Sequence, residues 1–286
     1  TLMRSSAASD VYKRQNLLCD ETRDLYSPTD NVDNIVWLSS REANWATKVM
    51  SNIDPDKSLA LLRFSNRDAK NGAEKLTTNG LECIYIPQIP IADITTETAW
   101  LYTAIAKYFI LEKYSVYDVI SEIPVEGNES RKTVSTIKKL LSKIEENIND
   151  ESLFSSSVTA LAKYLGYDTR PEHIDKLFDT ICDSSYHVAF EPDKYKHIAT
   201  TFHSSKGLEF EQVIVFAEDY SLKDMPSIYN HYVAATRAKN KLIIVKLNNY
   251  YANCFQNNLQ NIFSKSGHNI EDVAVSYTHL TLPTIA

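Results

Sequence analysis

The sequence predicts an α/β protein built on a parallel β-sheet, with a block of helices inserted between two parts of that sheet. Three observations predict this class. The apolar runs 212–217 and 242–245 flank a segment of helical character, and a strand, a helix and a strand in this order form a βαβ unit. A second alternation of strands and helices lies within 16–95. Between these regions, over 96–196, apolar residues recur at helical spacing.

The first region, 16–95, is predicted to alternate strands with helices. Largely apolar runs are typical of strands buried on both faces, and such runs lie at 35–38, 59–64 and 81–86. Ser39 or Ser40 is the expected N-cap of a helix that ends near residue 53. A second helix begins at residue 67 and ends before Gly80.

The central region, 96–196, is predicted to be an inserted helical subdomain. Pro171 is typical of a first helical position and Gly166 of a helix end. Its aromatic side chains are interpreted as core, rather than as a surface on which bases stack. The helices are expected at about 97–113, 134–148, 153–165 and 171–181.

The third region, 197–273, contains two polar runs. Residues 200–210 lead into the strand at 212–217, and residues 229–239 are predicted to form a helix before the strand at 242–245. Since α/β folds bind ligands at the carboxyl ends of parallel strands, polar side chains around this unit are candidates for a functional site. They are His203, Lys206, Glu209 and Arg237.

The two polar runs closely resemble the fifth and sixth motifs of the UvrD/PcrA/Rep family of superfamily 1 DNA helicases, in order, in spacing and at most positions. Residues 61–66 resemble, less closely, the strand and turn between the fourth and fifth motifs. The resemblance implies a RecA-like (P-loop NTPase type) parallel sheet with an inserted helical subdomain. The chain is therefore expected to be the second RecA-like domain of an ATP-dependent DNA helicase.

The resemblance also implies roles for individual residues. Arg237 is expected to be the arginine finger on the γ-phosphate of ATP. Glu209 is expected to bind the ribose, with Gly207 and Lys206 on the same edge of the nucleotide cleft. The residues expected to contact single-stranded DNA are Thr201, His203 and Ser204.

Arg237 has a chemical rationale of its own. Phosphoryl transfer needs charge stabilisation, and an arginine supplied across an interface is worth ~10³ to 10⁵ in rate. Its planar fork suits a terminal phosphate better than a lysine does. The alternative is a surface charge on a helix, which the flanking residues 232–236 disfavour. His203 alone would be interpreted as a hydrogen-bonded loop histidine, and Glu209 alone as an exposed carboxylate before a strand.

The phosphate-binding loop of such a motor is missing from the sequence. The six glycines include no pair with the spacing of Gly-x-x-x-x-Gly-Lys. The string from Asp20 to Asp24 copies a magnesium-binding motif, but it lies too close to the strand at 59 for the intervening motifs, and is interpreted as a chance match. ATP and Mg²⁺ are therefore expected to be bound mainly by a first RecA-like domain that the chain lacks, and the fragment is expected to be inactive as an ATPase.

Residues 1–15 and 274–286 are expected to derive from a sequencing adapter. Codons for 275–284 can be chosen so that their reverse complement, in a shifted frame, encodes 5–15. Unrelated chain ends should not be reverse complements, so neither segment is expected to belong to the natural fold. The remaining chain, 16–273, is expected to be an interior fragment.

Composition restricts the partners. The formal net charge of −7 argues against gripping duplex DNA by bulk charge, but it allows loops that hold single strands. The four cysteines have no paired or metal-ligand spacing, which is typical of reduced thiols in the cytoplasm, and no metal site is expected. No apolar run approaches the ~18 residues of a membrane span, so no membrane partner is expected.

Three hypotheses remain for the parent protein. The first is an ATP-dependent helicase that moves 3′ to 5′ on single-stranded DNA or 3′-tailed duplex DNA. The second is a nucleic-acid-binding scaffold that keeps the fold without the motor. The third is the helicase component of an anti-phage defence system, which the compact insert and residues 216–220 favour.

Overall fold

The computed structural model describes residues 35–41, 43–124 and 131–265. The expected adapter segments, 1–15 and 274–286, and the string from Asp20 to Asp24 lie outside these residues. The chain divides into two compact units. One unit contains most of the β-sheet and joins the described residues up to Cys83 with those from Lys196 onward, and the other spans Ile84–Tyr195. The sequence places the second boundary close to this point, at 196, and the first one later, at 96.

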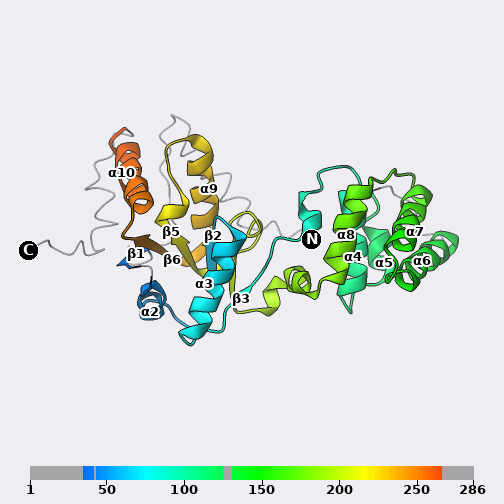
Figure 1. Ribbon diagram of the computed structural model, residues 1–286, viewed down its shortest axis with the longest axis horizontal. Coiled ribbons are helices and arrows are strands. Elements are labelled where there is room, and N and C mark those ends of the chain that lie inside the picture. The colour runs from blue at the N-terminus through cyan, green and yellow to red at the C-terminus, as the bar shows by residue number, and fades with distance from the viewer. Residues whose placement is uncertain (1–34, 42, 125–130, 266–286) are drawn as a thin grey trace, which may run out of the picture. The chain divides into compact units, whose positions relative to one another are not determined.

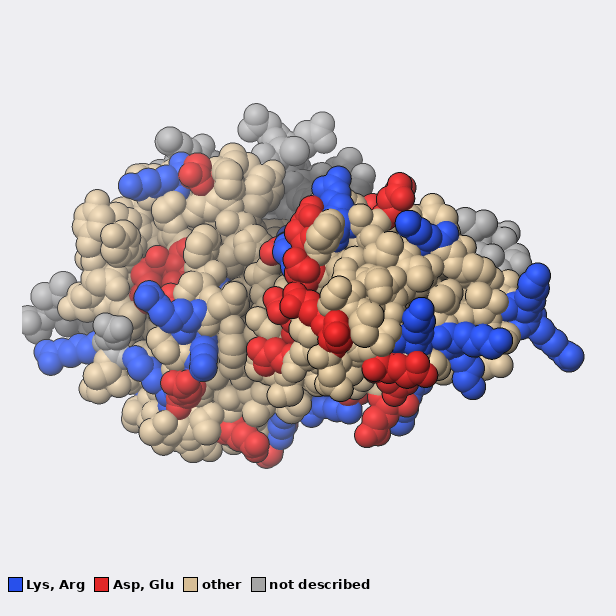
Figure 2. Space-filling view, turned by 45° about the vertical axis from the view of Figure 1, so that its right-hand side comes forward, with Lys and Arg blue, Asp and Glu red and all other residues tan. Residues whose placement is uncertain are grey.

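Charged side chains of both signs are interspersed on the face shown in Figure 2. Lys and Arg form small groups beside Asp and Glu, and neither sign covers this face continuously. A broad basic surface is therefore absent from this view.

The β-sheet has six strands in the order β1-β6-β5-β2-β4-β3 (Figure 1). The pairings of β1 with β6, β6 with β5, β5 with β2 and β2 with β4 are all parallel. The strands are β1 (Ile35–Ser40), β2 (Leu59–Arg63), β3 (Ile84–Tyr85), β4 (His197–Thr201), β5 (Phe210–Phe216) and β6 (Ala238–Leu247).

Helices cover both faces of this sheet, with α2 and α3 on one side and α9 and α10 on the other in Figure 1. This explains the continuous apolar runs, because a sheet buried on both faces cannot alternate apolar with polar residues. Leu59, Leu61 and Leu62 of β2 are fully buried, as are Val213 and Ile214 of β5. The helices are α2 (Trp45–Met50), α3 (Asn66–Thr78), α9 (Met225–Ala235) and α10 (Tyr250–Lys265), with a 3₁₀ turn at Ala217–Asp219.

Several boundaries differ from those predicted. Ser40 does not cap a helix, because it still pairs with Leu247 in the sheet, and α2 begins only at Trp45. The sequence predicts a helix over 229–239, but α9 begins earlier, behind the cap residue Asp224, and ends at Ala235. Strand β4 was not predicted, because its polar residues resemble a loop. All five residues of the strand are nevertheless buried.

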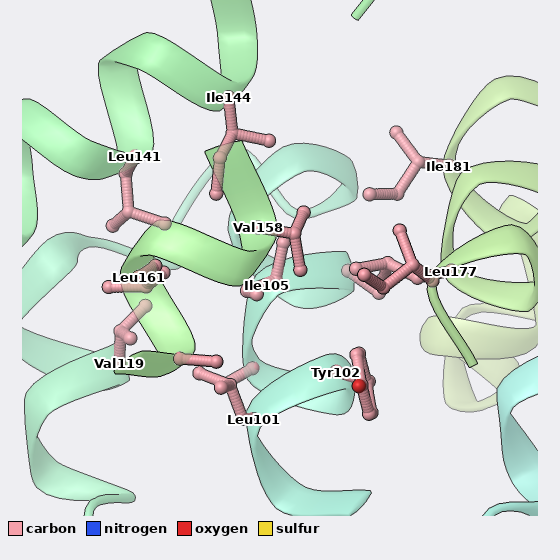
Figure 3. Close-up of a cluster of buried hydrophobic side chains, with 14 of the residues drawn as sticks. Leu101, Tyr102, Ile105, Val119, Leu141, Ile144, Val158, Leu161, Leu177 and Ile181 are labelled. Carbon is pink, nitrogen blue, oxygen red and sulfur yellow. The ribbon is translucent and has the colours of Figure 1, made fainter. Parts of the chain in front are cut away.

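The helical unit has a hydrophobic core of its own (Figure 3). Leu101 and Ile105 of α4 contribute side chains that point toward Val158 and Leu161 of α7, and Leu177 of α8 closes the cluster. The helices are α4 (Ala99–Ile110), α5 (Val116–Ser121), α6 (Arg131–Glu146), α7 (Glu151–Tyr164) and α8 (Pro171–Cys182), with 3₁₀ turns at Pro90–Asp93, Ser184–Phe190 and Pro192–Lys194.

Candidate functional site

The predicted site residues lie at two opposite edges of the sheet. Thr201 ends β4 and pairs with Arg63 at the end of β2, which places both at the carboxyl edge. Glu209 and Arg237 directly precede β5 and β6, whose first residues Phe210 and Ala238 pair with each other. Glu209 and Arg237 therefore lie at the amino edge, opposite Thr201.

A single segment, 202–209, connects the two edges. Because β4 and β5 both run parallel to β2, the chain must return along the sheet between them. It does so without a regular helix, through a turn at 202–207. The residues predicted to meet DNA therefore lie at one end of this segment, and Glu209 lies at the other.

The structure brings the three residues predicted to contact DNA into one turn. The Thr201 hydroxyl lies 3.1 Å from the Ser204 hydroxyl and accepts a hydrogen bond from the Ser204 backbone N–H at 3.3 Å. The Thr201 carbonyl accepts from the Ser205 N–H at 3.1 Å. Thr201 is buried, whereas Ser204 is half-buried and His203 is exposed. This turn presents His203 to solvent from a rigid base.

His203 is held against an aromatic neighbour. Its ring centroid lies 3.9 Å from that of the buried Phe202, with 37° between the ring planes. Partial burial lowers the pKa of His203, and the charge of Lys206 acts in the same direction. The ring is therefore more neutral at pH 7 than that of a free histidine, and can donate or accept a hydrogen bond.

Beside this turn lies an ion pair that could not be predicted from the sequence. The Arg63 guanidinium contacts Asp219 at 2.6 Å and Glu218 at 3.4 Å, and lies 3.9 Å from the centroid of the Phe216 ring. Burial alone would lower the pKa of Arg63, but the Asp219 hydrogen bond and charge raise it. Asp219 also accepts from the backbone N–H of Phe64 at 3.2 Å. The pair thus fixes the end of β2 beside the turn.

At the amino edge, Arg237 lies in the turn after α9. Its Nε donates to the carbonyl of Val233 at 3.0 Å and its Nη1 to that of Leu208 at 3.3 Å. Among the described residues, no carboxylate lies within salt-bridge distance of this guanidinium, and its Nη2 has no acceptor. Burial lowers the pKa of Arg237, while the Glu209 charge opposes this shift. The side chain is an oriented cation that can still meet an anion.

Glu209 is paired with a different cation. Its carboxylate lies 3.4 Å from Nζ of Lys239, an exposed pair of the kind that contributes little stability. Gly207 has φ +87, a conformation that other residues rarely adopt, and Lys206 beside it is exposed. The amino edge therefore combines the Arg237 guanidinium, the Glu209 carboxylate and its partner Lys239.

No group of three or more His, Cys, Asp or Glu side chains that could hold a metal ion occurs within 35–41, 43–124 and 131–265. In the same part of the chain, no helix has the length and apolar character required to cross a membrane.

Residues 197–245, which include the turn after β4 and the arginine before β6, match the UvrD-like helicase C-terminal domain family, and the chain carries such a domain. The RecA-like fold predicted from the sequence is confirmed. The chain is also 31% identical over 250 residues to Gabija protein GajB of Bacillus cereus, an alignment that covers 85% of this chain and 50% of GajB. The chain thus spans about half the length of the curated relative it matches.

Proposed function

We propose that this chain is the second RecA-like domain of an ATP-dependent DNA helicase, in which the amino edge of the sheet contacts ATP and the turn after β4 contacts single-stranded DNA. One observation carries the proposal most directly. The segment 202–209 begins beside Thr201 and His203 at one edge and ends at Glu209 at the other. A movement of one end is therefore transmitted to the other through a short, hydrogen-bonded connection.

The chemistry of the amino edge supports a nucleotide. Among the described residues, the Arg237 guanidinium is held by backbone carbonyls alone and its Nη2 has no acceptor, which suits the terminal phosphate, and the half-buried Glu209 carboxylate suits a ribose hydroxyl. ATP supplies the phosphoryl transfer that drives the cycle, with Mg²⁺ bound mainly by a first RecA-like domain. Arg237 stabilises charge on the transferred group, Glu209 orients the sugar, and Gly207 lies close to the same edge. The 286-residue chain alone is then inactive as an ATPase.

The turn after β4 provides the contact with DNA. Thr201 and Ser204 fix the turn through their hydroxyl groups, and His203 extends into solvent. Alternating ATP-bound and ATP-free states of the two RecA-like domains would then shift the strand past His203. We propose 3′ to 5′ movement on single-stranded or 3′-tailed duplex DNA, as in the helicases whose motifs the chain resembles.

The match to a Gabija protein favours one setting for this helicase. It supports the hypothesis that the parent is the helicase component of an anti-phage defence system. No observation favours the scaffold hypothesis, because a scaffold that never meets ATP has no need of an oriented arginine at the amino edge.

The decisive experiment compares Arg237→Ala with His203→Ala in this chain joined to a complete first RecA-like domain. Arg237→Ala is expected to reduce ATP turnover by about 10³-fold or more with single-strand affinity largely retained. His203→Ala is expected to weaken DNA affinity and DNA-stimulated turnover more than basal hydrolysis. Lys57→Ala, which removes an exposed cation distant in sequence, serves as the control. Equal behaviour of the two variants would contradict the assigned roles, and DNA binding without any turnover would favour the scaffold.

A further inference from the structure

The phenylalanine that directly follows β2 is exposed to solvent. Phe64 is 55% exposed, although residues 59–62 of β2 are fully buried and the neighbouring Phe202 is 1% exposed. A single exposed aromatic residue is common on protein surfaces. This one, however, lies at the carboxyl edge of the sheet, directly beside the turn that carries His203.

The ring of Phe64 belongs to a continuous aromatic row. Its centroid lies 5.8 Å from that of Phe202, with 35° between the planes, and Phe202 in turn lies 3.9 Å from His203. The buried Phe202 ring therefore contacts two more exposed rings. Flat, exposed rings of this kind are the surfaces on which single-stranded bases stack.

The backbone that carries Phe64 is fixed on both sides. Its own N–H donates to Asp219, and the Arg63 carbonyl accepts from the Phe202 N–H at 3.1 Å. The next residue, Ser65, accepts from the Asp68 N–H and caps α3. Little ordering of the backbone is thus left for a ligand to impose, which favours binding.

We propose that Phe64 and His203, backed by Phe202, form a base-stacking platform for single-stranded nucleic acid, with the exposed Lys206 as its phosphate contact. The Lys206 backbone N–H donates to the His203 carbonyl at 3.4 Å, so the lysine rises from the same turn. The inference rests on the proposed function, because it assigns a nucleobase to the turn that is proposed to contact DNA.

The first test is direct contact. The 286-residue chain is cross-linked by ultraviolet light to a single-stranded oligonucleotide that contains 5-iododeoxyuridine, and is then digested with trypsin. Cleavage after Arg63 and Arg67 releases residues 64–67 as a separate peptide. The expected result is a cross-link on this peptide. Cross-links confined to other peptides, in a chain that binds the oligonucleotide, would overturn the proposal.

The second test measures affinity by fluorescence anisotropy with the same chain. Phe64→Leu is expected to bind about five- to thirtyfold more weakly, the lower part of the range for one stacked base, whereas Phe64→Trp retains affinity. An oligonucleotide with abasic sites should abolish the difference between wild type and Phe64→Leu. Lys206→Ala should reduce the salt dependence of binding, which Phe64→Leu leaves unchanged. Tyr250→Leu removes a ring that is 71% exposed on α10 and is the matched control.

The outcomes separate the two proposals. If His203→Ala weakens binding and Phe64→Leu does not, the platform is refuted while the proposed function stands. A Phe64→Trp variant as weak as Phe64→Leu, or an equal loss on the abasic oligonucleotide, would reduce Phe64 to a structural role. If the wild-type chain, and the chain joined to a first RecA-like domain, show no affinity for single strands, both proposals fail.

Discussion

At the scale of single residues, two histidines of this chain have opposite surroundings. His203 lies exposed in the turn after β4, whereas His231 of α9 lies between Tyr220 and Phe255, with centroid distances of 5.1 Å to each ring. The Nε2 atom of His231 is buried and has no hydrogen-bond partner among the described residues. Desolvation lowers its pKa to about 4. His231 is therefore neutral in the folded protein and packs like an apolar side chain.

His231 predicts a loss of stability in acid. Because its folded-state pKa lies below the ordinary value of about 6.5, the unfolded chain binds a proton that the folded chain excludes. The contribution is complete above pH 6.5 and is lost as the pH falls from 6.5 to 4. At ~1.4 kcal/mol per pKa unit, the loss by pH 4 is about 3 kcal/mol. Urea unfolding of wild type and His231→Leu at pH 7, 6, 5 and 4 measures it.

The control for this titration is His203→Leu, which removes an exposed imidazole from the same unit. His231→Leu is expected to flatten the dependence of the unfolding free energy on pH between 6.5 and 4. His203→Leu is expected to keep the loss of unfolding free energy that His231 causes in acid. An acid loss that is unchanged in His231→Leu would show that His231 is protonated in the folded protein.

At the scale of elements, helix α3 packs closely onto β2 at Gly72. A Cβ added to Gly72 would lie 2.3 Å from Cδ2 of Leu61, which is fully buried. Alanine normally stabilises a helix interior by ~1 kcal/mol relative to glycine. Here the clash should exceed that gain, since overpacking a core costs ~1 to 3 kcal/mol.

Gly72→Ala is therefore expected to destabilise the sheet unit by about 1 kcal/mol or more, measured as a lower midpoint of urea unfolding. Asn71→Ala, on the exposed face of the same helix, is the matched control and should raise the midpoint slightly. A stabilised Gly72→Ala would show that α3 does not approach β2 as closely as described.

Elements with strong local signals could be predicted from the sequence, and those defined by distant contacts could not. Helix α8 begins at Pro171, as expected, because proline suits a first helical position. Strand β4 ends in Thr200 and Thr201, whose polar side chains resemble a loop, yet both are buried between neighbouring strands. Burial of threonine depends on what lies beside it in the sheet, which no local pattern reports.

The same limit applies to the candidate site. Residues in contiguous motifs, such as His203 and Glu209, could be identified by their neighbours in sequence. The pair of Arg63 with Asp219 joins positions 156 residues apart, so only the folded chain reveals it. Phe64 was present in the segment 61–66, but its exposure and its contact with Phe202 follow from that long-range packing.

At the scale of the whole molecule, the chain contains two hydrophobic cores in two compact units. The core of the helical unit is formed entirely by residues between Ile89 and Phe190. The core of the sheet unit includes fully buried side chains of β2, β5 and β6. Units with separate cores can open separately, each with its own free energy.

This independence predicts two distinct patterns of hydrogen exchange. Leu161→Ala empties part of the helical core, at a cost of about 2 to 5 kcal/mol, and should accelerate amide exchange in α4 to α8 while β5 and β6 remain protected. Ile214→Ala, an equally buried residue of β5, is the reciprocal variant and should do the opposite. Mass spectrometry of peptic peptides after timed exchange distinguishes the two patterns. If both variants accelerate exchange throughout the chain, the two cores unfold as one cooperative unit.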